Sequence, residues 1–399
     1  MVIHPAQLLF TLLLGFIAAL AVAVGAYLLY LANKKRVVVV ASPAPDDAEV
    51  RRSLALVKQQ RPGHRLALLA GAAALLLVAF GGKFLVRGFY PAGQAPAPLA
   101  NARSSTVQGA SGAQLSVLRY GPTDAPTLVF THGWGADRRD WAYAIQSLPP
   151  RYGVVVWDLP GLGKSTPTRG RDYSMATLAA DLDSVVSSVA GRPVILVGHS
   201  IGGIINLEYA RRFPQKMGQD VVGLVQVDTT FTNPVETKKN AERSRKLQGP
   251  VFEPLLHAVK ALSPVARGLG WLAYQSGLAH LQLASQSFAG SETWEELDDM
   301  ARYAYRSSPD VVARGVLAML HWDGSDVLPQ IKVPTLVISG KQDVTTLPAA
   351  SDRMAREIPL AQRVSVDHAA HLGPVEQARR YAQAITSFAD SEVEGGKEQ

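Results

Sequence analysis

The stretch VILVGHSIGG, residues 194–203, decides the fold of this 399-residue chain. It begins with an apolar, β-branched run, which predicts a short buried parallel strand. The chain then turns sharply at Ser200 into an apolar-patterned helix over 204–211. Gly198 and Gly202 suit this turn, because a Cβ at either position would clash where strand and helix nearly touch. The stretch therefore predicts a strand–turn–helix element that presents the Ser200 hydroxyl above a sheet, beside a helix N-terminus that favours negative charge.

Composition and charge limit the classes of function. The chain contains no cysteine, which excludes disulfides, thiolate metal sites and a cysteine nucleophile. Its net charge is +7, but the excess of basic residues lies between 33 and 87, and the residues from Gly88 onward are balanced. Such a distribution is typical of a segment that flanks a membrane, so we expect no nucleic-acid partner. No cluster of His, Asp and Glu has metal-ligand spacing, so no metal and no cofactor are expected.

Two long apolar runs precede the rest of the chain. Residues 7–32 carry no charge, and residues 66–86 are interrupted only by Lys83. Each run is long enough to cross a bilayer, and we interpret both as transmembrane helices. A cleavable signal peptide fits 7–32 poorly, because the basic cluster follows the apolar run. A buried core helix is the alternative for 66–86, but this run lacks a polar face.

The loop between the two runs indicates the topology. Residues 33–65 carry eight Lys or Arg residues, and within them 46–60 is predicted as a short surface helix. The positive-inside rule places such a loop in the cytoplasm, so the chain after the second run should lie on the extracytoplasmic side. We therefore expect a membrane anchor over 1–89, followed by a Pro/Ala linker over 90–100 that acts as a semi-rigid spacer.

Residues 101–399 are expected to form one α/β domain. An antiparallel hairpin over 107–119 opens it, and apolar strands then alternate with helices such as 175–190 and 204–213. This alternation predicts a mostly parallel sheet with helices on both faces. Between 231 and 327 no strand is recognisable, and such a stretch is too long for an ordinary connection, so we expect an inserted helical cap. The parallel strands are predicted at 127–131, 153–157, 194–197, 221–227, 335–339 and 363–366.

A nucleophilic serine needs a base to take its proton and an acid to orient that base. Asp343 lies in a loop directly after a predicted strand, and both His368 and His371 follow the next strand. Asp228 ends an earlier strand and is an alternative acid. The order Ser, Asp, His along the chain is the order expected for a serine presented on a strand-to-helix turn.

Five motifs in this order resemble the α/β-hydrolase fold superfamily, in its cap-bearing branch, over residues from about 114 to 388. The membrane hairpin lies outside the resemblance. The matching motifs are His132-Gly133-Trp134-Gly135, DLPGLGKS at 158–165, GHSIG at 198–202, GKQD at 340–343 and HLGPVE at 371–376.

The resemblance implies a role for particular residues. In the family the histidine commonly precedes a glutamate by five residues, which favours His371 over His368, although Ala370 replaces the usual glycine. Some relatives supply the acid from the position of Asp228, but an aspartate there is more often structural, so Asp343 is preferred.

The same resemblance implies an oxyanion hole and excludes some reactions. Backbone N–H groups of Trp134 and Ile201 are expected to stabilise the oxyanion of acyl transfer. His132 is expected to stabilise its loop, and His199 occupies a variable position of the turn. Relatives that open epoxides or cleave carbon–halogen bonds commonly carry aspartate where this chain has Ser200, which argues against both activities.

These observations predict a membrane-anchored serine hydrolase that cleaves an ester of a small molecule or a lipid-like substrate. Acyl transfer to an alcohol or amine, and hydrolysis of an amide or carbon–carbon bond, remain alternatives that use the same residues. An inactive binding module is a further alternative. Some aromatic residues of the cap are expected to line an acyl pocket: Trp271, Tyr274, Trp294, Tyr303, Tyr305 and Trp322.

Overall fold

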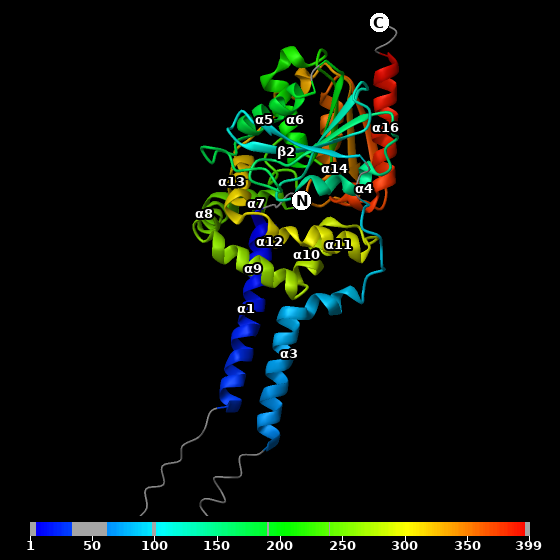
Figure 1. Ribbon diagram of the computed structural model, residues 1–399. Coiled ribbons are helices and arrows are strands. Elements are labelled where there is room, and N and C mark those ends of the chain that lie inside the picture. The colour runs from blue at the N-terminus through cyan, green and yellow to red at the C-terminus, as the bar shows by residue number, and fades with distance from the viewer. Residues whose placement is uncertain (1–4, 34–61, 98–100, 190, 239, 396–399) are drawn as a thin grey trace, which may run out of the picture.

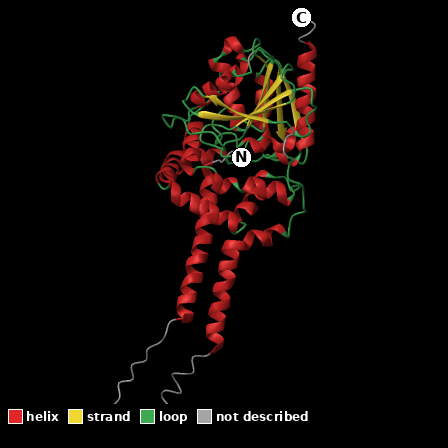
Figure 2. Ribbon diagram, viewed as in Figure 1, coloured by secondary structure: helices red, strands yellow, loops and turns green. Residues whose placement is uncertain are grey.

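An eight-stranded sheet forms the centre of the α/β domain (Figure 2). The computed structural model describes residues 5–33, 62–97, 101–189, 191–238 and 240–395. The strand order is β1-β2-β4-β3-β5-β6-β7-β8; β2 pairs antiparallel with β1 and β4, and the other neighbours pair parallel. The strands are β1 Arg103–Gln108, β2 Gln114–Tyr120, β3 Thr127–Thr131, β4 Gly153–Trp157, β5 Val194–His199, β6 Val221–Val227, β7 Thr335–Gly340 and β8 Ala361–Val366.

This topology confirms the predicted fold class. The bounds of β3, β4 and β6 are those predicted, because β-branched apolar runs fill both faces of a buried parallel strand. The opening hairpin begins at Arg103, earlier than predicted, since β1 pairs with β2 along its whole length. Its turn is the predicted one, where the Gly112 N–H donates to the Gly109 carbonyl at 3.0 Å.

Alternate residues of each parallel strand enter two separate apolar layers. One layer lies between the sheet and helices α5, α6 and α14, and the other lies between the sheet and helices α4 and α16. Both faces of the sheet are therefore buried, which holds the carboxyl ends of the strands in fixed positions. These helices are α4 Ala142–Ile145, α5 Met175–Ser187, α6 Ile201–Arg212, α14 Pro348–Glu357 and α16 Ala378–Gly395, with the short α15 Gly373–Glu376 before α16.

A helical layer follows β6 and precedes β7. Its described residues form helices and no strand, and Figure 1 shows most of them beneath the sheet, with the upper end of the first helix of the chain among them. We call this layer the cap. Its helices are α7 Ala241–Leu247, α8 Glu253–Ala261, α9 Ser263–Gln275, α10 Leu278–Ser287, α11 Trp294–Ala301, α12 Tyr303–Arg306 and α13 Pro309–Leu320, with the short helical turns η3 Gln248–Phe252 and η4 Leu328–Gln330. Two further short turns, η1 Arg138–Trp141 and η2 Pro214–Lys216, precede β6 and lie outside the cap.

Two long helices, α1 (Pro5–Asn33) and α3 (Pro62–Arg87), lie side by side and project away from the cap (Figure 1). Both are long and apolar enough to cross a membrane, judged by length and composition. Their upper ends pack against α9 and α10 of the cap. The basic loop that joins them, with the helix predicted at 46–60, lies outside the described residues.

Candidate active site

The turn at Ser200 has the tight geometry that the glycine pattern predicts. Ser200 has φ of 59° and ψ of −118°, a backbone conformation that residues other than glycine rarely adopt. A Cβ at Gly198 would lie 2.3 Å from the Gly202 carbonyl carbon, and a Cβ at Gly202 would lie 2.4 Å from the Thr131 carbonyl oxygen. The helix α6 starts at Ile201, earlier than the predicted 204, because the turn consists of the serine alone.

The structure brings together three residues that the sequence analysis selected. Ser200 Oγ lies 2.9 Å from His371 Nε2, and His371 Nδ1 lies 2.8 Å from Asp343 Oδ2. All three side chains are buried, with at most 1% of each residue exposed. They follow the carboxyl ends of β5, β7 and β8, so these three parallel strands present them on the same side of the sheet, where the strands end. An unbroken chain of hydrogen bonds therefore joins hydroxyl, imidazole and carboxylate.

Two threonines that the sequence analysis missed fix the carboxylate. Asp343 Oδ1 accepts hydrogen bonds from the Thr345 and Thr346 amides at 2.7 and 2.9 Å. The Thr346 hydroxyl donates to Asp343 Oδ2 at 2.7 Å. Aspartate commonly accepts hydrogen bonds from the backbone amides two and three residues later, so the contacts of Asp343 with Thr345 and Thr346 could have been predicted from the sequence. The orientation of Asp343 is thus set by its own loop.

The two alternative residues lie in other environments. Asp228 Oδ1 accepts from the Gly340 amide at 2.8 Å, and its Oδ2 accepts from the Tyr381 hydroxyl at 2.8 Å. Burial, together with the nearby Asp343 charge, raises the pKa of Asp228 well above its usual value. His368 is exposed, with its carbonyl bonded to Gln377 at 3.0 Å. Neither residue has a hydrogen bond to Ser200 or His371 among the described contacts.

A buried His–Asp pair, which the sequence analysis did not find, lies behind His371. His199 Nε2 lies 2.9 Å from the His371 carbonyl oxygen, and His199 Nδ1 lies 2.7 Å from Asp140 Oδ2. The same Asp140 oxygen accepts from the Gly133 amide at 2.9 Å. Burial raises the pKa of Asp140, whereas its bonds to His199 and to the Gly133 amide lower it. The pair thus links the turn after β3 to the backbone of His371.

The turn after β3 holds Trp134, the other predicted oxyanion donor besides Ile201. Its indole N–H donates to the Val312 carbonyl in α13 at 2.9 Å, so this turn is packed against the cap. Among the described residues, no acceptor is assigned to the backbone N–H of Trp134 or of Ile201. His132 bridges its own loop to the Leu159 amide at 3.0 Å, as expected of a group that stabilises the loop.

The cap is also bonded to the loop that follows His371. The Leu372 amide donates to the Ser287 carbonyl at 2.9 Å, and Glu376 accepts from the amides of Ala289 and Ser291 at 2.9 and 3.1 Å. The glutamate that singled out His371 in the sequence is therefore a cap contact.

Most aromatic side chains of the cap have packing or hydrogen-bonding partners away from Ser200. Trp322 donates to Glu208 at 2.9 Å, Tyr303 donates to Asp137 at 2.9 Å, and Trp294 stacks on His280.

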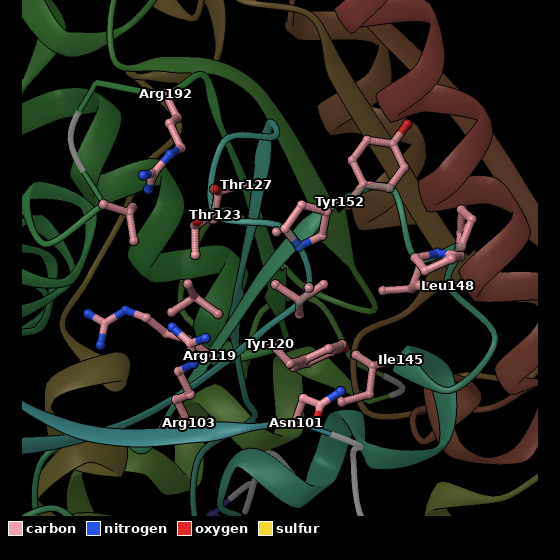
Figure 3. Close-up of a pocket in the computed structure, with 18 of the residues that line it drawn as sticks. Asn101, Arg103, Arg119, Tyr120, Thr123, Thr127, Ile145, Leu148, Tyr152 and Arg192 are labelled. Atoms are coloured by element: carbon pink, nitrogen blue, oxygen red, sulfur yellow. The ribbon is translucent and has the colours of Figure 1, made fainter.

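A pocket of about 820 Å³ opens at the opposite edge of the sheet (Figure 3). Thr127 and Gly153, the first residues of β3 and β4, lie among its lining residues. Since Ser200, Asp343 and His371 follow the carboxyl ends of their strands, this pocket is separate from the site described above. It contains three arginines, Arg103, Arg119 and Arg192, and no acidic residue lines it.

A parallel sheet with a serine on a strand-to-helix turn, followed by an acid and a histidine, defines an α/β-hydrolase. The family model described as Alpha/beta hydrolase family matches residues 128–384, and the chain belongs to this family.

Similar proteins differ in the activities that their names give. The magnesium-chelatase 30 kDa subunit of Rhodobacter capsulatus is 28% identical over 266 residues, which cover 64% of this chain and 84% of that protein. A solved esterase from Thermogutta terrifontis is 23% identical, with a TM-score of 0.58, and covers 73% of this chain and 99% of its own. A membrane phospholipase A, a bacterial virulence factor, is 23% identical, with a TM-score of 0.57, and covers 86% of this chain and 99% of its own. At these identities the two structures show the fold alone.

Proposed function

We propose that this protein is a membrane-anchored serine hydrolase that cleaves carboxylic esters. The observation that carries the proposal is the hydrogen-bonded series from Ser200 through His371 to Asp343, with contacts of 2.9 and 2.8 Å. A hydroxyl at this distance from an imidazole can lose its proton as it attacks a carbonyl carbon. The likeness to an esterase and to a phospholipase supports an ester as the substrate.

The proposed reaction has two steps. Ser200 Oγ attacks the ester carbonyl carbon while His371 Nε2 takes the hydroxyl proton, and Asp343 stabilises the resulting imidazolium. The backbone N–H groups of Trp134 and Ile201 stabilise the oxyanion. His371 then gives its proton to the departing alcohol, which leaves an acyl-enzyme on Ser200. Water, deprotonated by His371, attacks this acyl-enzyme and releases the acid.

A fluorophosphonate probe tests the nucleophile directly. Wild-type protein should be labelled covalently, and the Ser200→Ala variant should not be labelled. The Ser200→Ala variant should also lose hydrolysis of a set of esters of increasing acyl length, which wild-type protein should cleave. Absence of labelling in the wild type, or equal labelling of the variant, would show that Ser200 is not the nucleophile. Measuring ester products with and without an added alcohol or amine separates hydrolysis from acyl transfer.

The membrane anchor is the second part of the proposal. Both α1 and α3 have the length and hydropathy of membrane spans, and the basic loop between them is expected in the cytoplasm. The hydrolase domain would then lie on the extracytoplasmic side. Protease added outside sealed cells should remove this domain while a cytoplasmic control protein stays intact. Protection of the domain under conditions that digest a known exposed protein would reverse the topology.

A further inference from the structure

The outward surface of the cap is unusually apolar. We call the exposed part of α8, α9 and the adjoining residues the outer cap face. In the remainder of the hydrolase domain, across the described residues of 101–230 and 331–392, the large apolar side chains that are exposed are Val344 and Leu360. The outer cap face has six exposed large apolar side chains within about thirty residues of sequence: Val251, Leu255, Leu262, Val265, Trp271 and Leu281.

The charge of this segment is equally one-sided. No acidic residue occurs between Glu253 and Glu292, and the basic residues there are Lys260 and Arg267. Arg267 is exposed among the apolar side chains of α9. Apart from Glu253, which lies 3.3 Å from His321 at the start of α8, the charged residues of this surface are basic. Such a surface matches the interface of a bilayer with anionic headgroups, where Lys and Arg contact phosphates and apolar side chains enter the acyl region.

The outer cap face continues the apolar surface of the two long helices. A Cβ at Gly15 of α1 would lie 2.1 Å from the Leu269 carbonyl oxygen of α9. A Cβ at Gly82 of α3 would lie 2.3 Å from the carbonyl oxygen of Ser276, which directly follows α9. The Phe80 and Trp271 rings lie 6.0 Å apart. Backbones in such close contact leave no gap between the hairpin and α9.

The length of the hairpin beyond these contacts matches a bilayer. Residues 16–33 of α1 extend about 27 Å from the contact with α9, and residues 62–81 of α3 extend about 30 Å, at 1.5 Å per residue. The hydrocarbon core of a bilayer is about 30 Å thick. Figure 1 shows the upper end of α3 turning to run beneath the cap, where Phe84 and Leu85 are about two-thirds exposed. A bilayer that spans α1 and α3 therefore meets α9 at its surface.

From these observations we infer that the outer cap face is embedded in the leaflet nearest the hydrolase domain, so that the site takes its ester from the bilayer. The inference rests on the proposed membrane anchor and deepens the proposed function by naming a membrane lipid as the substrate. The helices of the cap connect this face to the site, because α9 packs on α12 and α13, and α13 accepts a hydrogen bond from Trp134 in the turn after β3.

Single cysteines can report the depth of each surface without interference, because the native chain contains none. Full-length Val265→Cys, Leu20→Cys and Leu360→Cys proteins, each carrying a fluorescent label, are placed in vesicles of phosphatidylethanolamine and phosphatidylglycerol that contain a spin-labelled quencher lipid. Leu20 tests the membrane-spanning helix, Val265 tests the outer cap face, and Leu360 is an exposed apolar control on the core. We expect quenching at Leu20 and Val265 and none at Leu360.

The outcomes separate the inference from the proposal on which it rests. Quenching at Leu20 without quenching at Val265 would overturn the embedded cap and leave the membrane anchor intact. No quenching at Leu20 would reject the anchor and the embedded cap together. Disulfide cross-linking of Val265→Cys between two chains, without quenching by lipid, would mean that a second copy covers this face, and would also overturn the inference.

An activity measurement tests the substrate. The double variant Leu262→Glu/Val265→Glu should hydrolyse a long-chain ester in vesicles at least about tenfold more slowly than wild type, because charged side chains resist burial in lipid. Its rate on a short water-soluble ester should stay within about twofold, as should both rates of the Leu360→Glu control. Equal loss on both substrates, or loss on neither, would contradict a supply of substrate from the bilayer.

Discussion

The core and the cap differ in where their apolar side chains point. In the core, apolar residues enter the two layers beside the sheet, and the described surface exposes two large ones, Val344 and Leu360. In the cap, apolar residues contact the site loops on one side and are exposed on the other, along α8 and α9. An exposed apolar surface of this kind is typical of a site that contacts a membrane, a ligand or another protein. The core therefore buries its large apolar side chains around the sheet, whereas the cap leaves a group of them exposed.

The largest expected effect tests the core. Replacing His371 by Ala removes the group that lies 2.9 Å from Ser200 Oγ. Loss of the base of such a triad lowers kcat by about 10⁶-fold, so we expect a loss of this size on a soluble ester. The His368→Ala variant is the control and should retain wild-type kcat, since this exposed side chain has no bond to the site among the described contacts. Comparable losses in both variants would contradict the assignment.

A smaller effect is expected behind the site, at Asp140. This carboxylate bonds to His199 at 2.7 Å and to the Gly133 amide at 2.9 Å, so it positions the turn after β3 relative to His371. Asp140→Asn should lower kcat about 10- to 100-fold with little change in KM, because small displacements of reacting groups cost rate more than binding.

Asp137→Asn is the matched control for this measurement. Asp137 lies in the same turn, but its bonds go to Arg139 and Tyr303. Its kcat should stay within about threefold of wild type. A change in KM alone at Asp140 would argue against a positioning role.

A third prediction concerns the junction between cap and hairpin. Gly82→Ala would place a Cβ 2.3 Å from the Ser276 carbonyl oxygen and should lower the free energy of unfolding by about 1–3 kcal/mol through overpacking. Gly81→Ala is a control in the same helix, because the nearest atom to its Cβ is the Phe84 ring at 3.9 Å. Thermal unfolding in lipid nanodiscs compares the two. Equal stability would mean that α3 does not pack against α9.

The smallest expected effect lies within the cap and depends on pH. Burial raises the pKa of Asp298, but hydrogen bonds from His280 and Tyr274 and the Arg302 charge lower it to about 2. Because the folded pKa lies below the unfolded value of 3.8, the carboxylate stabilises the cap above about pH 4 and loses this effect as the pH falls toward 2.

The expected loss on acidification is at most about 2.5 kcal/mol, from about 1.4 kcal/mol per pKa unit. Acid unfolding followed by cap proteolysis should therefore be less steep between pH 5 and 2 for Asp298→Asn than for wild type. An identical pH profile in the two proteins would exclude Asp298 as the titrating group.

Local patterns were sufficient to predict the sheet and the residues gathered at its edge. Apolar β-branched runs gave the bounds of β3, β4 and β6, and the order of Ser200, Asp343 and His371 followed from the strands that precede them. The start of α6 was misplaced by three residues, because a helix that begins directly at a turn shows no separate cap residue in the sequence.

Contacts between distant segments could not be predicted in the same way. Asp140 and His199 are 59 positions apart, and neither carries a local signal of burial. Asp140 stands among arginines, as a surface residue would. The outer cap face was also missed, since a helix with apolar residues on several sides suggests packing in the interior. Only the fold reveals which of those sides is left exposed.

The close approach at the turn separates the residues that the fold requires from those that catalysis requires. The separation of 2.3 Å between a Cβ at position 198 and the Gly202 carbonyl carbon constrains the backbone, whatever the side chain at position 200 does. A duplicated copy of the gene could lose Ser200 by mutation and stop turning over any substrate, yet it would have to keep both glycines to fold. The glycines therefore report the strand-to-helix turn, and catalysis is reported separately, by the serine, the histidine and the aspartate.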